Sequence, residues 1–255
     1  MQYQRPAVAS QPVRLMPRPV FLAGRVGLLA DLDARLAGGA GGLRMVALCG
    51  LGGTGKTSVA LEYGYRHLAG LGLVWQFPAE EPTELAAGFG VLAAGLGAAD
   101  RPSVDPVAQV HGLLADRPGG WLLIFDNAPD AAALAEVLPP AGDGQVIITT
   151  RNPHWPGDQA VEVPVLDTAA AAGFLQARTG DRDQAAAEDL AGELGGLPLA
   201  LEQAAAYANA AGPGKGPGTR RGRGRAAEPA GLLCAGRHPL PAPAPGRHPA
   251  RVACP

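Results

Sequence analysis

The chain has 255 residues, of which 47% are hydrophobic, 17% charged and only 5% aromatic, a composition typical of a globular protein of one domain or one and a half. It has neither an uninterrupted apolar run of about 18 residues nor an apolar segment near its start, so the sequence predicts no transmembrane helix and no secretory signal. Three cysteines are too few for a disulfide framework, and we expect a cytoplasmic protein.

The formal net charge of −2 conceals two segments of different composition. Residues 211–255 carry eight Lys or Arg and one Glu, for a net charge of +7, whereas the preceding 210 residues carry a net charge of −9.

Short apolar runs alternate with helical stretches over most of the chain. Residues 1–19 show no periodicity and are expected to be a flexible lead, and residues 27–39 predict an amphipathic helix that Gly38 and Gly39 end. An alternation of short buried strands and helices is typical of a parallel sheet covered on both faces. The predicted strands are 45–49, 73–77, 121–125, 145–150 and 160–165, and the predicted helices between them are 56–68, 83–96, 106–115 and 130–138. An α/β domain is therefore expected over residues 20–165.

After residue 165 the predicted strands stop. Residues 167–179, 183–194 and 198–210 are rich in Ala, Leu and Glu and predict an incomplete helical subdomain over 166–210. In 211–255, 34 of 45 residues are Gly, Ala, Pro or Arg. Such a segment buries too little apolar surface to offset the entropy of ordering it, so we expect a disordered tail.

The stretch from Gly50 to Thr57 matches the pattern G-x-x-x-x-G-K-[ST] of phosphate-binding loops and lies between a predicted strand and a predicted helix. Glycines let backbone N–H groups converge on one anion, and the helix adds its positive end. Lys56 is expected to bind the β- and γ-phosphates, and the Thr57 hydroxyl to bind Mg²⁺. The remaining residues expected at the phosphates are Gly50, Gly52, Gly53, Thr54, Gly55 and Ser58. A glycine-rich turn that fits the pattern by chance is the alternative.

Two further polar residues follow predicted strands. Asp126 ends the apolar stretch from residue 121, where its carboxylate can hold Mg²⁺ directly or through water; an ordinary turn aspartate is the alternative. The next residue, Asn127, has an amide that cannot act as a base, so any hydrolysis should be slow. Arg151 follows the strand at 145–150, where it can reach a γ-phosphate or simply lie on the surface.

Together with GGLPLA at 195–200, these motifs resemble the NB-ARC nucleotide-binding domain of the STAND class of signalling ATPases, from residue 19 to about 210. The resemblance implies a five-stranded parallel P-loop sheet followed by helical and winged-helix subdomains. It also implies that Arg151 senses the γ-phosphate and that Pro198 packs on the adenine. The FLAGR stretch at 21–25 resembles the family's entry motif, which implies that Ala23 lies near the adenine and Arg25 near the nucleotide. The Gly/Ala/Pro/Arg tail begins where the winged helix would follow, as a truncated or frameshifted carboxyl terminus would.

The sequence thus predicts a signalling switch that binds ADP or ATP with Mg²⁺ and is at most a slow ATPase. The alternatives are a catalytic P-loop enzyme, either an AAA+-type ATPase or a kinase, and an inert truncated relic. Besides nucleotide, we expect protein partners or self-association through domains absent from this chain, and no membrane. The arginines at 219–225 lack interleaved aromatic residues, which argues against nucleic acid.

Overall fold

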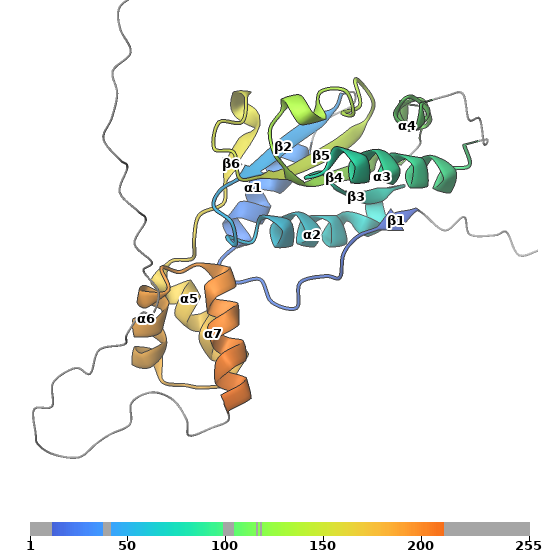
Figure 1. The fold of residues 1–255 in the computed structure, drawn as a ribbon. Coiled ribbons are helices and arrows are strands. Elements are labelled where there is room, and N and C mark those ends of the chain that lie inside the picture. The colour runs from blue at the N-terminus through green and yellow to red at the C-terminus, as the bar shows by residue number, and fades with distance from the viewer. Residues whose placement is uncertain (1–11, 38–41, 99–104, 116, 118, 212–255) are drawn as a thin grey trace, which may run out of the picture. The chain divides into compact units, whose positions relative to one another are not determined.

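The computed structural model describes residues 12–37, 42–98, 105–115, 117 and 119–211, and its central element is a six-stranded sheet (Figure 1). The strand order is β1-β3-β4-β5-β2-β6, and every pairing is parallel. The strands are β1 (Val13–Arg14), β2 (Arg44–Cys49), β3 (Val74–Pro78), β4 (Trp121–Ala128), β5 (Gly144–Thr150) and β6 (Ala160–Glu162). The predicted α/β P-loop architecture is confirmed.

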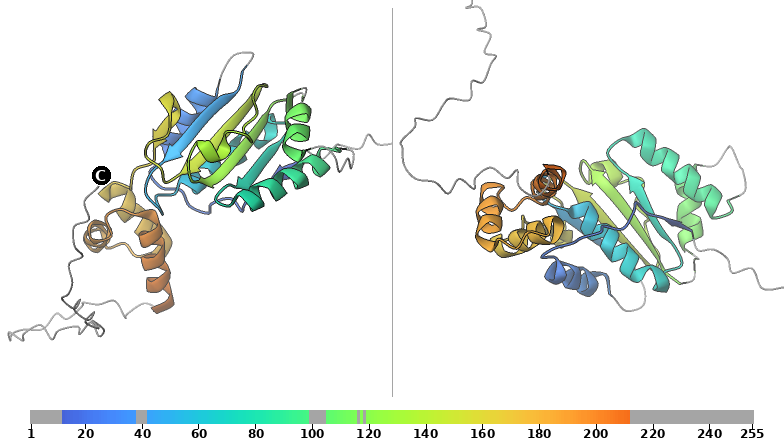
Figure 2. Two further views of the ribbon diagram at one scale, coloured as in Figure 1. Left: turned by 45° about the horizontal axis from the view of Figure 1, so that its top comes forward. Right: turned by 90° about the horizontal axis from the view of Figure 1, so that it is seen from below.

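Helices cover both faces of this sheet because its strands are apolar on both sides. In β4, Trp121 and Phe125 enter one buried cluster with α3 (Pro82–Gly95) and α4 (Pro106–Ala115), whereas Leu122 and Ile124 enter another with α1 (Val26–Leu36) and α2 (Lys56–His67). Successive side chains of a strand point to opposite faces, so a continuous apolar run supplies both cores. Seen from below in Figure 2, α1 and α2 lie in front of the strands.

Three further helices pack around a core of their own. These are α5 (Thr168–Thr179), α6 (Gln184–Glu193) and α7 (Pro198–Ala211). The side chains of Asp167 and Asp183 accept hydrogen bonds from the first turns of α5 and α6, as N-caps do. Phe174, Leu175 and Leu201 are among the buried residues of this core. Across the part of the chain that the structure describes, no helix is both long and apolar enough to cross a bilayer.

The structure corrects the expected helix at 130–138. Only Ala132–Leu134 is helical, as a single 3-10 turn, η2. Asp130 caps the turn through the N–H of Ala133 at 2.9 Å, and Pro139 disfavours helical backbone angles at Leu138, so no helix continues past this point. Two other 3-10 turns, η1 (Leu68–Gly70) and η3 (Gly157–Gln159), were not expected.

The sheet also has one strand more than the resemblance implied. β1 lies within the predicted flexible lead and pairs with β3, with Val13 opposite Val74. Met16 N–H donates to the side chain of Gln76 at 2.9 Å, and the Tyr65 hydroxyl donates to Met16 O at 2.9 Å. Residues 12–19 are therefore attached to the sheet and α2. Residues 1–11, Gly38 and Gly39, and the tail from residue 212 on lie outside the described residues.

A buried carboxylate fastens this amino-terminal segment to α2. Arg18 donates two hydrogen bonds of 2.9 Å to Glu62, which is 8% exposed, and Arg66 donates a third at 2.9 Å. The bonds from Arg18, only partly opposed by burial, together with Arg66 lower the pKa of Glu62 from 4.5 to about 2.

Glu62→Gln should therefore destabilise the protein at neutral pH but progressively less in acid. A carboxyl whose pKa falls on folding contributes stability above its ordinary value of 4.5, and that stability is lost as the pH falls toward about 2. Urea unfolding of both proteins between pH 3 and 7 checks this. A difference between their midpoints that is constant over the whole range would contradict it.

Candidate functional site

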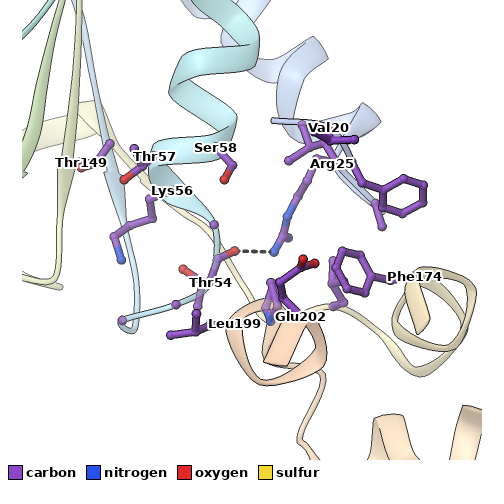
Figure 3. Close-up of a pocket in the computed structure, with 18 of the residues that line it drawn as sticks. Val20, Arg25, Thr54, Lys56, Thr57, Ser58, Thr149, Phe174, Leu199 and Glu202 are labelled. Atoms are coloured by element: carbon purple, nitrogen blue, oxygen red, sulfur yellow. Dashed lines mark hydrogen bonds between the residues drawn. The ribbon is translucent and has the colours of Figure 1, made fainter. Parts of the chain in front are cut away.

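A cavity of about 640 Å³ opens where β2, β4 and β5 end, beside the first turn of α2 (Figure 3). Its lining comes from the glycine loop, the ends of β4 and β5, the segment before α1, and helices α5 and α7. Among the residues predicted from the sequence, the lining contains Ala23, Arg25, Gly52, Gly53, Thr54, Gly55, Lys56, Thr57, Ser58, Asp126, Arg151 and Pro198. Gly50 is not in the lining and instead supplies a carbonyl that binds Lys56.

The loop between β2 and α2 has the backbone shape that its glycines predict. Gly53 and Gly55 have φ angles of 83° and 91°, a left-handed conformation that glycine adopts without a Cβ clash. A Cβ on Gly53 would also lie 2.8 Å from the Cβ of Leu199 at the start of α7. Gly53 is therefore required both by the turn and by the close approach of α7.

Arg25 stabilises the glycine loop through hydrogen bonds to backbone carbonyls. Its side chain is 4% exposed, and its guanidinium donates to the carbonyl oxygens of Thr54 at 2.9 Å and Pro164 at 2.6 Å. Figure 3 shows the bond to Thr54 as a dashed line. Arg25 holds the loop through these two bonds and also lines the cavity, and its place near the nucleotide stays a prediction.

Lys56 is a second buried cation of the site. It is 8% exposed, and its ammonium donates to Gly50 O at 2.9 Å and Leu51 O at 2.7 Å. Burial first, and then the positive charge of Arg151, lower the pKa of Lys56. Two cations that repel each other in one cavity form a favourable site for an anion, because an anion between them relieves the repulsion.

Three hydroxyl and carboxylate side chains converge from three elements. Thr57 of α2 and Thr149 of β5 each donate a hydrogen bond of 2.7 Å to Oδ1 of Asp126 at the end of β4. Mg²⁺ prefers such oxygen ligands and is bound through one or two carboxylates together with substrate phosphates. The donor set therefore fits a magnesium–nucleotide complex in which Thr57 and Asp126 hold the metal. Within the described residues, no cluster of three or more His, Cys, Asp or Glu offers a metal site of another kind.

The other end of the cavity is largely apolar. Phe21 and Phe174 meet edge to face with ring centroids 5.4 Å apart, and Leu22, Leu166 and Pro198 line the same cavity. Arg178 and Glu202 form an ion pair that also lines it. Figure 3 shows Lys56, Thr57 and Thr149 at one side of the cavity and Phe174 and Glu202 at the other. The site thus has a cationic end suited to phosphates and an apolar end suited to a flat ring.

Sequence reasoning missed Thr149, Phe174, Arg178, Leu199 and Glu202. Thr149 carried a usable signal, since it lies two residues before Arg151 at the end of a predicted strand. Leu199 also carried one, because it follows Pro198 in the GGLPLA motif, whereas Phe174, Arg178 and Glu202 carried none, because only the packing of α5 and α7 brings them to the cavity.

A strand, glycine loop and helix with Lys56, Thr57 and Asp126 at one sheet edge define a P-loop nucleotide-binding domain. The chain is 30% identical over 196 residues to a nucleotide-binding leucine-rich repeat (NLR)-like protein of Hyaloscypha variabilis, a match that covers 64% of this chain and 20% of that protein. It is 27% identical over 214 residues to the regulatory protein AfsR of Streptomyces coelicolor, a match that covers 76% of this chain and 22% of AfsR. The chain thus spans about a fifth of these curated relatives.

Solved structures share the fold. A STAND protein with a tetratricopeptide repeat sensor from Pyrococcus horikoshii superposes with a TM-score of 0.50 at 19% identity, covering 72% of this chain and 30% of that one. The Orc1 protein of Aeropyrum pernix, solved in complex with DNA, superposes with a TM-score of 0.51 at 18% identity, covering 76% of this chain and 61% of that one. No family model matches the chain. The motifs and these relatives together support a P-loop ATPase domain of the NB-ARC/STAND class.

Asp126→Ala should weaken Mg²⁺-dependent ATP binding by more than tenfold, or ~1.4 kcal/mol, while changing Mg²⁺-free ADP binding much less. The reason is that the carboxylate acts through the metal, whereas the loop and Lys56 bind phosphates without it. Calorimetry with and without Mg²⁺ measures both affinities, and Asp130→Ala, an exposed aspartate four residues along, is the control. Equal losses in the two titrations would make Asp126 a structural residue.

Proposed function

We propose that this chain is the nucleotide-operated part of a signalling ATPase, which binds ADP or ATP with Mg²⁺ and changes conformation with the nucleotide. The observation that carries this proposal is the single cavity that Lys56, Thr57 and Asp126 share with Pro198 and Phe174. A nucleotide with its phosphates on the loop and its base at the apolar end would contact the sheet and the helices at once. We assign residues 20–165 as the nucleotide-binding domain and 166–210 as the helical subdomain that responds.

A direct contact between loop and helices supports this coupling. The N–H of Leu199, in the first turn of α7, donates to the carbonyl of Gly53 at 3.2 Å. A small change in the loop therefore acts on the start of α7. A ligand shifts an equilibrium between two arrangements only by its difference in affinity for them, and contacts with both parts supply such a difference.

Arg151 is suited to distinguish ATP from ADP. It is exposed at the mouth of the cavity, beyond the end of β5, and its Nε would lie 3.9 Å from a Cβ on Gly52. A guanidinium over the loop can bind a γ-phosphate through charge-assisted hydrogen bonds. ADP lacks that group.

Two features favour a switch over a motor or a kinase. The side chain of Asn127 is an amide, which cannot act as a base. The similar proteins whose names state an activity are regulatory or signal-transducing. By analogy with the leucine-rich and tetratricopeptide repeats in their names, we propose that proteins are the partners of the longer molecule. The DNA in the Orc1 structure is a partner of that protein.

The most direct experiment is to purify the chain, denature it and identify any released nucleotide by chromatography. Released ADP supports the switch. If the protein releases no nucleotide and binds neither ADP nor ATP in titrations, the alternative of an inert truncated relic describes it better.

Lys56→Ala should reduce ADP and ATP affinity by at least 100-fold, or ~2.7 kcal/mol, because the variant loses the buried cation at the phosphate end. Removing an ammonium satisfied only by loop carbonyls should leave the fold intact. Calorimetry measures the affinities, and thermal unfolding of the same samples provides the control. Unchanged ATP affinity would contradict the site assignment.

Arg151→Ala should narrow the ratio of ATP to ADP affinity severalfold without abolishing either, since its guanidinium is placed at the γ-phosphate. Parallel titrations with both nucleotides test this, and Arg182→Ala in an exposed loop is the matched control. If the ratio is unchanged, Arg151 is a surface arginine.

A further inference from the structure

A carboxylate lies beside Asn127, the residue whose amide cannot act as a base. The side-chain amide of Asn127 donates to Oε2 of Glu80 at 2.6 Å. Glu80 is exposed and lies just after β3, the strand next to β4. Asn127 itself lines the cavity together with Asp126 and Lys56. Asn127 therefore joins the cavity to an acidic side chain from another strand.

The backbone explains why residue 127 is an asparagine. The β4–β5 register shifts between Phe125 and Ala128, and within this bulge Asn127 has a φ angle of 62°. Its N–H donates to the hydroxyl of Thr149 at 2.8 Å. Asparagine tolerates left-handed backbone angles that most side chains resist, and bulges beside active sites redirect side chains. A glutamate at this position would be strained.

The pairing of β3 with β4 brings Glu80 to the same edge. Pro78 lies opposite Asp126, and the N–H of Ala79 donates to Asp126 O at 2.8 Å. Glu80 therefore follows directly at the end of the strand beside the proposed magnesium ligand. Asp126 already accepts hydrogen bonds from Thr57 and Thr149 on one oxygen, whereas Glu80 has no comparable task at the metal.

We propose, resting on the nucleotide-binding function above, that Glu80 is the proton acceptor for ATP hydrolysis at this site and that Asn127 positions it. The oxygen of a water attacks the γ-phosphorus as the bond from that phosphorus to the β–γ bridging oxygen breaks. One water proton passes to the Glu80 carboxylate, and the other stays on the released phosphate. The bridging oxygen leaves with ADP, and Glu80 then returns its proton to solvent.

The same geometry accounts for slow turnover. Glu80 is exposed and is not among the residues that line the cavity, so its carboxylate must reach its catalytic position in competition with solvent, guided by the one bond from Asn127. We therefore expect turnover that is measurable but below ~1 s⁻¹, the lower end of typical enzyme rates. We still expect slow hydrolysis, as the sequence predicts. The reason is now the position of the proposed base, Glu80, and not the lack of any base at the site.

Three variants of the full chain test the proposal. Glu80→Gln keeps an oxygen that can accept the bond from Asn127 but cannot take a proton. Asn127→Gly removes the amide while tolerating the φ of 62°. Glu81→Gln is the matched control, because Glu81 is an exposed neighbour whose side chain makes no cap bond to α3. Phosphate release gives kcat and KM, titrations give MgATP and ADP affinities, and thermal unfolding reports the fold.

Glu80→Gln should lower kcat about 100-fold, within the range for general-base removal, with nucleotide affinities and melting temperature unchanged. Asn127→Gly should lower kcat with KM unchanged, and Glu81→Gln should behave as the wild type. Turnover by Glu80→Gln equal to the wild type would overturn the proposal. So would a wild-type chain that binds MgATP and never hydrolyses it, a result that leaves the proposed switch intact. Failure to bind any nucleotide would overturn both.

Discussion

The site depends on the convergence of two threonine hydroxyls on one oxygen of Asp126. Thr57 comes from α2, Thr149 from β5 and Asp126 from β4, so the two bonds of 2.7 Å join three elements at the edge of the sheet. The same hydroxyl of Thr149 accepts the N–H of Asn127 and so stabilises the bulge in β4. The proposed metal-binding position, the bulge and the direction of Asn127 therefore form one hydrogen-bonded unit.

The electrostatics of the same end of the cavity favour an anion. Lys56 is buried, its pKa is lowered by that burial, and its ammonium is held by two loop carbonyls. Those carbonyls are weaker partners than phosphate oxygens, because an anionic oxygen adds Coulomb attraction to the hydrogen bond from the ammonium. A polyphosphate would also relieve the repulsion between Lys56 and Arg151. The free energy of this relief is available for binding and, in the proposed switch, for moving α7 through the bond between Gly53 and Leu199.

Much of this could be predicted from the order of residues, and the reason is that the relevant signals are local. Apolar runs of about five residues predict buried parallel strands, and parallel strands place their carboxyl ends at one edge. A glycine loop between such a strand and a helix, followed by Lys56, has few uses other than binding phosphate. The meeting of Thr57 with Asp126, 69 residues apart, follows from these two facts without knowledge of the packing. The helix expected at 130–138 was wrong: despite a favourable composition, only a single 3-10 turn forms there.

Other features depend on contacts between residues that carry no motif. The attachment of residues 12–19 rests on Glu62, whose partner Arg18 lies 44 positions away. The apolar end of the cavity forms where α5 packs against α7 and brings Phe174 and Glu202 beside the loop, with Phe21 from the segment before α1. Asn127 read alone indicated a site without a base, whereas strand pairing places Glu80 at 2.6 Å from its amide, 47 residues away in the chain. Local periodicity specifies which elements form, but the neighbours of a side chain across a sheet are set by register and packing, which no short stretch of residues encodes.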